Sequence, residues 1–598
     1  MRYKIDSGNS TRINITGRRT GERPGCVRIF HKGQLSEEAY YKFSGFETFL
    51  FIWEKEQEYE VEICELEVSL AYSYCPDCVL EQGVRFIEFK DKAYFYTKDN
   101  LKDALTQDYR NTFHFSPYKN WMNDPNGLCW FKGYYHLFYQ YNPNGQEWGN
   151  MHWGHAVSKD LLHWVHQPVA AYPQIELNGC EGEYRGGAFS GSAVIEKDVM
   201  HLFYTRHFGK TDRSWQRQWQ VTKQSKDGVH FTHEECAVWG TPEGVTWHFR
   251  DPKVVQIEDK WNMIIAGSCY DRPAVFRYES DDLKSWKYAG ILYGETDPQY
   301  GIAECPDFFY LDGTWVLIVS YIYADGRKDG RDVVWYTGTY KDGKFDPENK
   351  GLLDEGKDYY APQSFEVEGE RISAGWNCHR LGQHIAQPGS ANGSLSLPRK
   401  LAVKNGKLYS QVIPQIQELF TEKAENGPYF LSMRKTKEIK ESTVLSLAGS
   451  LAGKVNLYIG ETALKLTLEK EDAEDYMDYI VDSLATPYMA AVAKIEGEAK
   501  ELGIKGHQVD QKDTILALLD GNDELCLAVR KKEKSLTECL AKILTFSSEC
   551  AIQVPDAIVK LAEFRMNGKK EAMRSPVYEG GETKADVRRI AKEYYLEA

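Results

Sequence analysis

The sequence predicts an all-β protein whose central part is a five-bladed β-propeller. Between about residues 112 and 400, strand-like runs alternate with turns rich in glycine and aspartate, and little of this stretch has the period of an α-helix. The same stretch contains a fivefold internal repeat, which is the sequence signature of a repeat architecture. Alternation and repetition together predict this fold.

Each repeat is a charged two-residue turn followed by an alternating or apolar strand. The repeats start about 60 residues apart, slightly more than the roughly 40–50 residues of a four-stranded blade, which leaves room for loops. The five segments are KGYYHLFYQ from Lys132, KDVMHLFYT from Lys197, DKWNMIIAG from Asp259, DGTWVLIVS from Asp312 and EGERISAGW from Glu368. Five blades are the simplest interpretation.

Three carboxylates recur at one place in this repeat. Counting back eight residues from each turn, across the preceding strand, reaches Asp124, Phe189, Asp251, Glu304 and Tyr360. In a propeller the first strand of each blade lies innermost, so equivalent positions at its start form a ring around one mouth of the central channel. A single Asp or Glu is most often a solvated surface group. The shared offset favours a site in which Asp124, Asp251 and Glu304 converge.

The composition restricts the class of partner. A chain of 598 residues is expected to hold two or three domains. The formal net charge of −15 argues against a nucleic-acid or membrane partner, because phosphate contacts need clustered Lys and Arg. Aromatic residues, 13% of the chain, suit strands and also stack on sugar rings. We expect a small-molecule or oligosaccharide substrate, no nucleic acid and no membrane, and we leave a homo-oligomer open.

The N-terminal segment and the cysteines predict a cytoplasmic protein. MRYKIDSGNSTRINITG has no apolar signal-peptide core, and no apolar run approaches the 18 residues that a spanning helix needs. Thirteen cysteines without framework spacing fit reduced thiols. The close pair Cys75 and Cys78 has no second CxxC or HxxxH to complete a zinc site, so we expect none.

Clustered carboxylates predict acid–base chemistry. They cannot all ionise at low cost, so one is kept protonated near neutrality while another stays an anion. Cleavage of a glycosidic bond needs this combination, an acid for the leaving oxygen and a carboxylate that attacks or guides water. We expect Arg250 to hold the neighbouring Asp251 charged, and Cys305 to be a small packing residue.

Six motifs around these residues closely resemble the signatures of glycoside hydrolase family 32, the invertases and fructan hydrolases. They occur in the order and spacing of that family, and together they are highly specific. The motifs are WMNDPNG at Trp121 to Gly127, FYQYNP at Phe138 to Pro143, WGNMHWGHAVSKDLLHW from Trp148, FSGSA at Phe189 to Ala193, FRDP at Phe249 to Pro252 and ECPDFF at Glu304 to Phe309. Only this resemblance names fructose as the sugar.

The resemblance implies a propeller followed by a β-sandwich, and a retaining two-step mechanism at a β-D-fructofuranosyl unit. It implies that Asp124 is the nucleophile, that Glu304 is the acid and later the base, and that Asp251 holds the fructose hydroxyls and stabilises the transition state. The positions that it implies for binding the terminal fructosyl unit are Asn123, Gln140, Trp148, Phe189, Ser190 and Arg250. It implies no metal and no cofactor.

Ala303 departs from the family pattern, and two histidines could suggest a metal site. Ala303 precedes Glu304 where many relatives carry Trp or Tyr, which affects the shape of the leaving-group side. His152 and His155 could be mistaken for metal ligands, but we expect buried histidines satisfied by hydrogen bonds. The later elements DEGKDYYAPQSF and GSLSLPRKL match the family, so we expect the propeller to close near residue 400.

We therefore expect three domains: an N-terminal β-rich accessory domain at 1–108, the catalytic propeller at 109–400, and a β-sandwich-like domain at 401–598 that diverges at its end. TFLFIWEKEQEYEVEICELEVSLAYSY and VRFIEFKDKAYFYTK predict strands in the first domain. In the third, VLSLAGSLAGKVNLYIG predicts strands, whereas YMAAVAKIEGEAKELG and ETKADVRRIAKEYYLEA predict helices.

The favoured function is a β-fructofuranosidase that removes terminal fructose from sucrose or short fructo-oligosaccharides. Three alternatives stay open: a fructosyltransferase with the same site, an inverting five-bladed hydrolase of arabinan or xylan, and a catalytically silent sugar-binding protein. WMNDPNG argues against the second, and the presence of all three carboxylates argues against the third. Linkage preference depends on loops at the channel mouth, which the sequence does not resolve.

Overall fold

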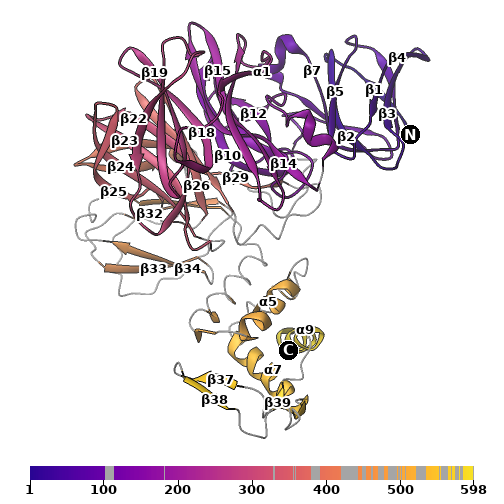
Figure 1. Cartoon of the computed structure of the whole chain (residues 1–598). Helices are drawn as coiled ribbons and strands as arrows, with labels where there is room; N and C mark the ends of the chain where they lie inside the picture. Colours follow the sequence, from indigo (N-terminus) through magenta and orange to yellow (C-terminus); the bar gives the residue numbers. More distant parts are fainter. Residues whose placement is uncertain are drawn as a thin grey trace. The chain divides into compact units, whose positions relative to one another are not determined.

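The computed structural model describes residues 1–101 and 114–418, apart from 181, 327–329, 355, 357 and 379–390, together with separate stretches between 442 and 596. The chain forms two compact units, Met1–Glu425 and Asn426–Ala598, and Figure 1 shows the elements of each. Strands far outnumber helices among the described residues, which confirms the predicted all-β class.

The first hundred residues form two β-sheets packed on one core. Strands alternate buried and exposed residues, and the buried set from one sheet, including Val27 and Ile29, meets Ile13 and Ile15 of the other. The first sheet has the order β1 (Arg2–Asp6), β6 (Glu58–Cys64), β3 (Gly25–His31), β4 (Gln34–Tyr41), and the second β5 (Glu47–Ile52), β2 (Arg12–Arg19), β7 (Leu66–Tyr74), β8 (Arg85–Phe89), β9 (Ala93–Tyr96). The two runs predicted as strands therefore form β5 to β9.

These two sheets belong to the same compact unit as the propeller and are hydrogen-bonded to its first blade. A short 3₁₀ turn, η1 (Pro76–Cys78), and α1 (Val79–Gln82) follow β7. The backbone N–H of Val84 donates to the carbonyl of His166 at 3.0 Å, and the Gln167 amide donates to the carbonyl of Val79 at 2.9 Å. An ion pair between Lys119 and Glu88 at 2.8 Å and the stacked rings of Phe86 and Tyr118 add charged and apolar contacts.

The next 300 residues form the five four-stranded antiparallel blades that the repeat predicts (Figure 1). From the innermost strand outward they are β10 (Asn120–Phe131), β11 (Tyr134–Asn142), β12 (His152–Ser158), β13 (Trp164–His166); β14 (Tyr184–Glu196), β15 (Val199–Lys210), β16 (Gln216–Ser225), β17 (Glu235–Val238); β18 (Val245–Ile257), β19 (Lys260–Cys269), β20 (Arg272–Ser280), β21 (Lys287–Gly294); β22 (Tyr300–Leu311), β23 (Thr314–Tyr323), β24 (Arg331–Lys341), β25 (Lys344–Leu352); and β26 (Tyr359–Val367), β27 (Glu370–Asn377), β30 (Arg399–Lys404), β31 (Lys407–Val412). A 3₁₀ turn, η2 (Ile175–Gly179), lies between the first two blades.

The ring of blades closes between the fifth and the first. Each inner strand contacts the next, and β26 contacts β10. Two short strands reinforce the junction: β28 (Ala391–Asn392) pairs in parallel with β10, and β29 (Ser394–Leu395) pairs with β27. Because β30 and β31 belong to the fifth sheet, this sheet runs to Val412, past the residue 400 at which we expected the propeller to close.

Apolar clusters fill the space between neighbouring blades. Ile264 and Ala266 of the third blade, for example, pack against Phe308 and Leu317 of the fourth. These residues come from continuous apolar runs such as MIIAG and VLIVS, which suit strands that are buried on both faces. This packing holds the inner strands at fixed distances from one another, so groups at their starts are held rigidly.

The second unit, described alone, contains short strand pairs and helices. A short helix, α3 (Pro414–Glu418), ends the described part of the first unit. The elements of the second are β32 (Ser442–Leu447) with β35 (Met477–Asp482), β33 (Gly453–Ile459) with β34 (Thr462–Leu468), β36 (Ile552–Gln553) with β39 (Tyr578–Glu579), β37 (Glu563–Met566) with β38 (Lys569–Ala572), α5 (His507–Leu519), α7 (Leu536–Cys550) and α9 (Lys584–Leu596).

Part of the C-terminal prediction can be compared with these elements. Strands β32 and β33 fall in VLSLAGSLAGKVNLYIG, and α9 falls in ETKADVRRIAKEYYLEA, as predicted. Most of YMAAVAKIEGEAKELG lies outside the described residues. In the parts of the chain that the structure describes, no helix is long and apolar enough to cross a membrane.

Candidate active site

All five inner strands carry a β-bulge at the same place near their start. Within each bulge, two residues of the inner strand oppose one residue of the second strand. The bulged pairs are Asn123 and Asp124, Phe189 and Ser190, Asp251 and Pro252, Cys305 and Pro306, and Ala361 and Pro362. Proline fits here because the bulge leaves its position out of the ladder, where no N–H is needed.

The bulges bring the three predicted carboxylates to one end of the propeller, but not from one register position. Glu304 directly precedes its bulge, Asp251 is the first residue of its bulge, and Asp124 is the second. The offset of eight was therefore an approximation. The third hairpin turn starts at Glu258, not at Asp259, and eight residues before it lies Arg250.

Backbone conformation explains why these shifted positions still converge. Asp251 has φ of 63° and Cys305 has φ of 46°, a region that residues other than glycine rarely adopt. Such a dihedral angle turns the side chain away from the direction that strand alternation would give it. Two of the residues at the site, Asp251 and Cys305, are thus strained bulge residues, as is frequent at functional sites.

Asp124 is held by a hydroxyl and lies next to a thiol. The Ser190 hydroxyl of the second blade donates to Asp124 Oδ2 at 2.7 Å. The Cys305 sulfur of the fourth blade lies 3.7 Å from the same oxygen. Burial raises the pKa of Asp124, the bonds from Ser190 and Asn123 oppose this shift, and the charge of Glu304 adds to it.

Asp251 is the most deeply buried of the three carboxylates. Its Oδ2 accepts a hydrogen bond from the backbone N–H of Cys305 at 2.9 Å and lies 3.6 Å from the sulfur of that residue. Its own N–H donates to the Thr205 hydroxyl at 2.9 Å. Burial raises the pKa of Asp251 to about 7; Arg250 opposes the shift, and the charge of Glu304 adds to it.

Glu304 is held by two donors, one on each oxygen. Arg250 Nη2 donates to Oε1 at 2.7 Å, and the Tyr360 hydroxyl donates to Oε2 at 2.6 Å. Burial alone would raise the pKa of Glu304, but Arg250 and Tyr360 together lower it below its usual value. We expected Arg250 to hold Asp251 charged; Arg250 does lower the pKa of that carboxyl, but burial outweighs it, and the arginine lies closer to Glu304 than to Asp251, which is 3.8 Å away.

Comparison with known proteins identifies this arrangement. The family model of the glycosyl hydrolases family 32 N-terminal domain matches residues 114–412, which includes all five blades. The chain belongs to glycoside hydrolase family 32. The match confirms the family suggested by the sequence motifs.

The relatives of this family 32 protein have named activities. It is 33% identical over 379 residues to sucrose-6-phosphate hydrolase of Escherichia coli, a match that covers 61% of this chain and 74% of the relative. It is 36% identical over 337 residues to sucrose-6-phosphate hydrolase of Zymomonas mobilis, covering 53% of this chain and 64% of that protein, slightly less than two thirds.

A solved family 32 structure from Bifidobacterium adolescentis has a TM-score of 0.64 and 28% identity, and the match covers 75% of this chain and 81% of that one. The protein is thus a glycoside hydrolase of the β-fructofuranosidase type, with the all-β architecture that its sequence predicts.

The predicted pocket residues of this family 32 protein lie around the carboxylates. The Phe189 ring stacks on His207 with centroids 4.4 Å apart and meets Trp148 edge-on at 5.5 Å. Gln140 is buried and donates to the carbonyl of Ala188 at 2.9 Å, so it holds the second bulge. Asn123 accepts a hydrogen bond from the indole N–H of Trp121 at 2.8 Å.

Sequence reasoning missed three residues that contact this site. Tyr360 was reached by the repeat offset but was given no role, although it donates to Glu304. His248 contacts Arg250 with a nitrogen–nitrogen distance of 2.6 Å. Cys305, expected only to pack, contacts both aspartates. Only Tyr360 had a signal in the sequence, its place in the repeat.

The two histidines that could suggest a metal are buried and contact other groups. His152 and His155 are buried, and burial lowers the pKa of His152 to about 3. The His152 Nδ1 lies 3.1 Å from the carbonyl of Asn150, and the His155 Nε2 lies 3.0 Å from His136. Within the described ranges, no group of three or more His, Cys, Asp and Glu side chains could hold a metal ion.

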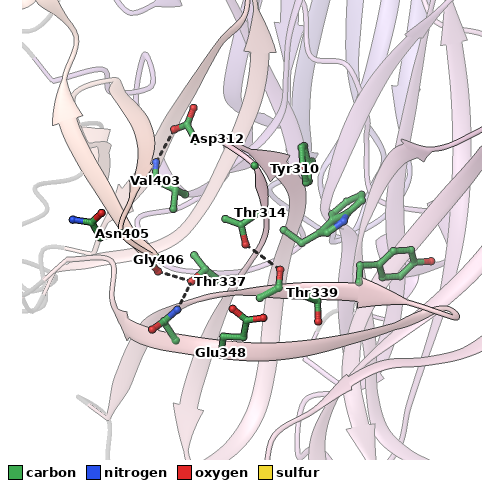
Figure 2. Close-up of a pocket in the computed structure, with 14 residues that line it drawn as sticks. Tyr310, Asp312, Thr314, Thr337, Thr339, Glu348, Val403, Asn405 and Gly406 are labelled. Carbon is green, nitrogen blue, oxygen red and sulfur yellow. Dashed lines mark hydrogen bonds between the residues drawn. The ribbon is translucent and has the colours of Figure 1, made fainter.

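A separate groove of about 480 Å³ lies at the hairpin end of the fourth blade. Figure 2 shows how Asp312 there accepts a hydrogen bond from the N–H of Val403 at 2.8 Å, and how Thr314 donates to the carbonyl of Gly338 at 3.0 Å. The first bond joins the fourth blade to the β30–β31 hairpin of the fifth, and the second joins β23 to β24 within the fourth blade. The groove contains none of the predicted site residues, which lie at the other end of the inner strands.

Proposed function

We propose that this family 32 protein hydrolyses terminal β-D-fructofuranosyl units from sucrose-type substrates, with retention of configuration, through a covalent fructosyl-enzyme. One observation carries this proposal. The oxygens of Asp124 and Asp251 lie 3.7 and 3.6 Å from the sulfur of Cys305, the residue that follows Glu304. Three carboxyl groups thus surround one small space, which suits attack on one side of a sugar and proton donation on the other.

In this mechanism Asp124 attacks the anomeric carbon of the fructosyl unit. The Ser190 bond orients the carboxylate, and burial removes water that would weaken the attack. Asp251 accepts hydrogen bonds from fructose hydroxyls and stabilises the positive charge that develops on the ring. The pocket residues Asn123, Gln140, Trp148, Phe189, Ser190 and Arg250 shape the space for the terminal fructosyl unit, directly or by holding the bulges.

Glu304 donates a proton to the departing oxygen and later takes one from water. In the free protein Asp251 holds a proton more readily than Glu304, because Arg250 and Tyr360 lower the pKa of Glu304. The three groups share protons as a coupled set. Bound sugar displaces water from Glu304, and this desolvation raises its pKa and favours the protonated form. After donation, Arg250 and Tyr360 stabilise the carboxylate that forms.

The substrates that we propose are sucrose and short fructo-oligosaccharides, with phosphorylated sucrose among them because two of the relatives are named sucrose-6-phosphate hydrolases. Release of fructose from sucrose, sucrose 6-phosphate, kestose, inulin and levan would rank these substrates. Equal release of fructose and glucose at high sucrose concentration would exclude a fructosyltransferase. The cytoplasmic location predicted by the sequence stays a prediction, which cell fractionation would test.

The nucleophile assignment is tested by Asp124→Asn. Because the amide cannot form the ester intermediate, we expect kcat to fall by roughly three or more powers of ten while the melting temperature stays within a few degrees. Steady-state rates and calorimetry measure the two effects. Near-normal turnover by this variant would refute the role of Asp124.

The acid and the stereochemistry are tested separately. Glu304→Gln should lose activity on sucrose and recover part of it on fructosyl fluoride, whose leaving group needs no proton. In a methanol–water mixture, methyl β-fructofuranoside should be the first methanolysis product detected by NMR. The α-anomer would exclude the retaining mechanism.

A further inference from the structure

Arg331 lies beside the residues that hold the proposed acid, at the start of β24 in the fourth blade. Its guanidinium carbon is 5.0 Å from the centre of the Tyr360 ring and 5.8 Å from that of Trp376. The Tyr360 hydroxyl in turn donates to Glu304. Two aromatic faces therefore hold the arginine in place. One of them, Tyr360, also binds Glu304, the carboxyl group that donates the proton.

No carboxylate among the described residues forms an ion pair with Arg331. Within the described ranges, its guanidinium contacts the sulfur of Cys378, 4.0 Å from Nη1. The neighbouring Asp332 directs its Oδ2 instead to the hydroxyls of Tyr300 and Tyr323, each at 2.9 Å. Burial lowers the pKa of this half-buried guanidinium, but the nearby Tyr360, Cys378, Glu304 and Asp124 raise it, so Arg331 stays a cation. Because no described carboxylate bonds its donor fork directly, that fork is open to an anion supplied from outside.

The position of Arg331 indicates which part of a substrate that anion would belong to. Glu304 must lie against the leaving oxygen in order to protonate it, so the leaving sugar occupies the side of the pocket formed by Glu304 and Tyr360. Arg331 packs on Tyr360 and so belongs to this side. The fructosyl unit itself lies deeper, between Asp124 and Asp251.

Charge balance supports the same conclusion. Three carboxyl groups on their own would repel an anionic substrate. Arg250 does not offset this for a ligand, because it is already paired with Glu304 at 2.7 Å. Arg331 supplies a cation whose fork of donors is not used by a carboxylate among the described residues, and such a fork matches the oxygens of a phosphate.

We propose that Arg331 binds a phosphate group on the leaving sugar, so that the preferred substrate is a β-fructofuranoside of a phosphorylated hexose, such as sucrose 6-phosphate. This proposal rests on the proposed function, because it assigns the leaving-group side from the role of Glu304. It assigns Arg331 to specificity and not to the chemical step.

The test compares kcat/KM for sucrose 6-phosphate and for sucrose in the full-length wild-type protein and in Arg331→Met, whose side chain keeps the packing on Tyr360 and Trp376. We expect the wild type to prefer the phosphorylated sugar, and the variant to lose about tenfold to hundredfold of that preference. Arg331→Lys should recover part of it, since it restores the charge but not the fork.

Arg371→Met is the matched control, because Arg371 also stacks on an aromatic ring, Phe309 at 4.3 Å, but lies at the other end of the fifth blade. It should leave the ratio of the two kcat/KM values unchanged. An equal fall for both substrates in Arg331→Met would mean that the arginine only balances the carboxylates, and would overturn the proposal. A wild type without preference for the phosphorylated sugar would also overturn it.

A binding measurement separates this proposal from the proposed function. Calorimetric titration should show that glucose 6-phosphate binds the wild type more tightly than glucose does, and that Arg331→Met loses this difference. If neither substrate is cleaved, the proposed function fails, and the titration still decides on Arg331. If sucrose is cleaved but glucose 6-phosphate binds no better than glucose, only the assignment of Arg331 fails.

Discussion

At the scale of single residues, the protonation of the site is decided by Tyr360 and Arg250. They donate to opposite oxygens of Glu304 and lower its pKa, while Asp251, which accepts one backbone N–H, has a pKa raised to about 7 by burial. The pKa values of these two neighbouring carboxyl groups are thus shifted in opposite directions from their usual values. Environment, and not residue type, assigns the proton.

Tyr360→Phe should move the alkaline limb of the kcat/KM profile to higher pH. The limb reports loss of the proton from Glu304 in the free protein, and removing the hydroxyl removes one cause of its lowered pKa. Rates between about pH 3 and pH 7 would measure this, because the lowered pKa of Glu304 puts the limb in the acidic range. Tyr359→Phe, on the same strand but with no hydrogen bond to Glu304, is the control. A limb that stays in place, or moves to lower pH, would contradict the assignment of Glu304.

Asp251→Asn should stabilise the fold at neutral pH while abolishing most activity. The folded pKa of about 7 exceeds the unfolded value, so the folded state holds the proton more tightly and loses stability as pH rises toward 7. The amide removes this loss. We expect the variant to gain on the order of 1–3 kcal/mol at pH 8 and little at pH 4, measured by denaturant unfolding. An equal gain at both pH values would exclude protonation as the cause.

At the scale of elements, the bulge in each inner strand positions the chemistry. Side-chain bonds between neighbouring inner strands hold these bulges in place. The Ser192 hydroxyl of β14 donates to the carbonyl of Pro252 at 2.8 Å, and it accepts from the N–H of Val254 at 2.9 Å, both in β18. One hydroxyl thus satisfies two buried backbone groups, one in the bulge that contains Asp251 and one just after it.

Ser192→Ala should therefore weaken both the fold and the reaction. Two buried backbone groups lose their partners, at a cost of about 1–3 kcal/mol each, and Asp251 is no longer held in place by its neighbour. We expect a lower melting temperature and a severalfold lower kcat. Ser410→Ala is the control, because that hydroxyl has no hydrogen bond to a described residue. Unchanged kcat in Ser192→Ala would show that the bulge holds its shape without this bond.

At the scale of the whole molecule, closure of the ring determines whether the first and fifth blades present their residues together. Gly393 lies between β28 and β29, with φ of 96°, and a Cβ there would lie 2.2 Å from the carbonyl oxygen of Met122. Met122 directly precedes Asn123 and Asp124. The closing segment thus packs against the backbone that carries the proposed nucleophile.

Gly393→Ala should destabilise the protein and reduce kcat together. The matched control is Gly369→Ala, at φ of 79°, where an added Cβ meets nothing within 4 Å, so both variants carry the strain of positive φ but only one carries the clash. We expect the difference between them to be about 1–3 kcal/mol in stability. Equal melting temperatures of the two variants would show that the junction adapts without cost.

Much of this protein could be predicted from residue patterns. The fivefold repeat of a turn and an apolar strand predicted five blades, because alternation and burial on both faces are local properties of the chain. WMNDPNG, FRDP and ECPDFF predicted the family, and the three carboxylates predicted from them do converge. The strands of the N-terminal domain were predicted for the same local reason. Its bonds to the first blade were not, since they join distant residues.

The sequence by itself determined which residue types line the inner strands and which family they belong to. Only the tertiary structure decided which groups touch: that Arg250 binds Glu304 at 2.7 Å and lies farther, at 3.8 Å, from its neighbour Asp251, and that Tyr360 also binds Glu304. It also decided that the three acids come from three different positions at or next to the bulge. The physical reason is that a bulge with positive φ turns a side chain away from strand alternation. The direction of that turn is fixed by cross-strand pairing and ring closure, which join residues far apart in the chain.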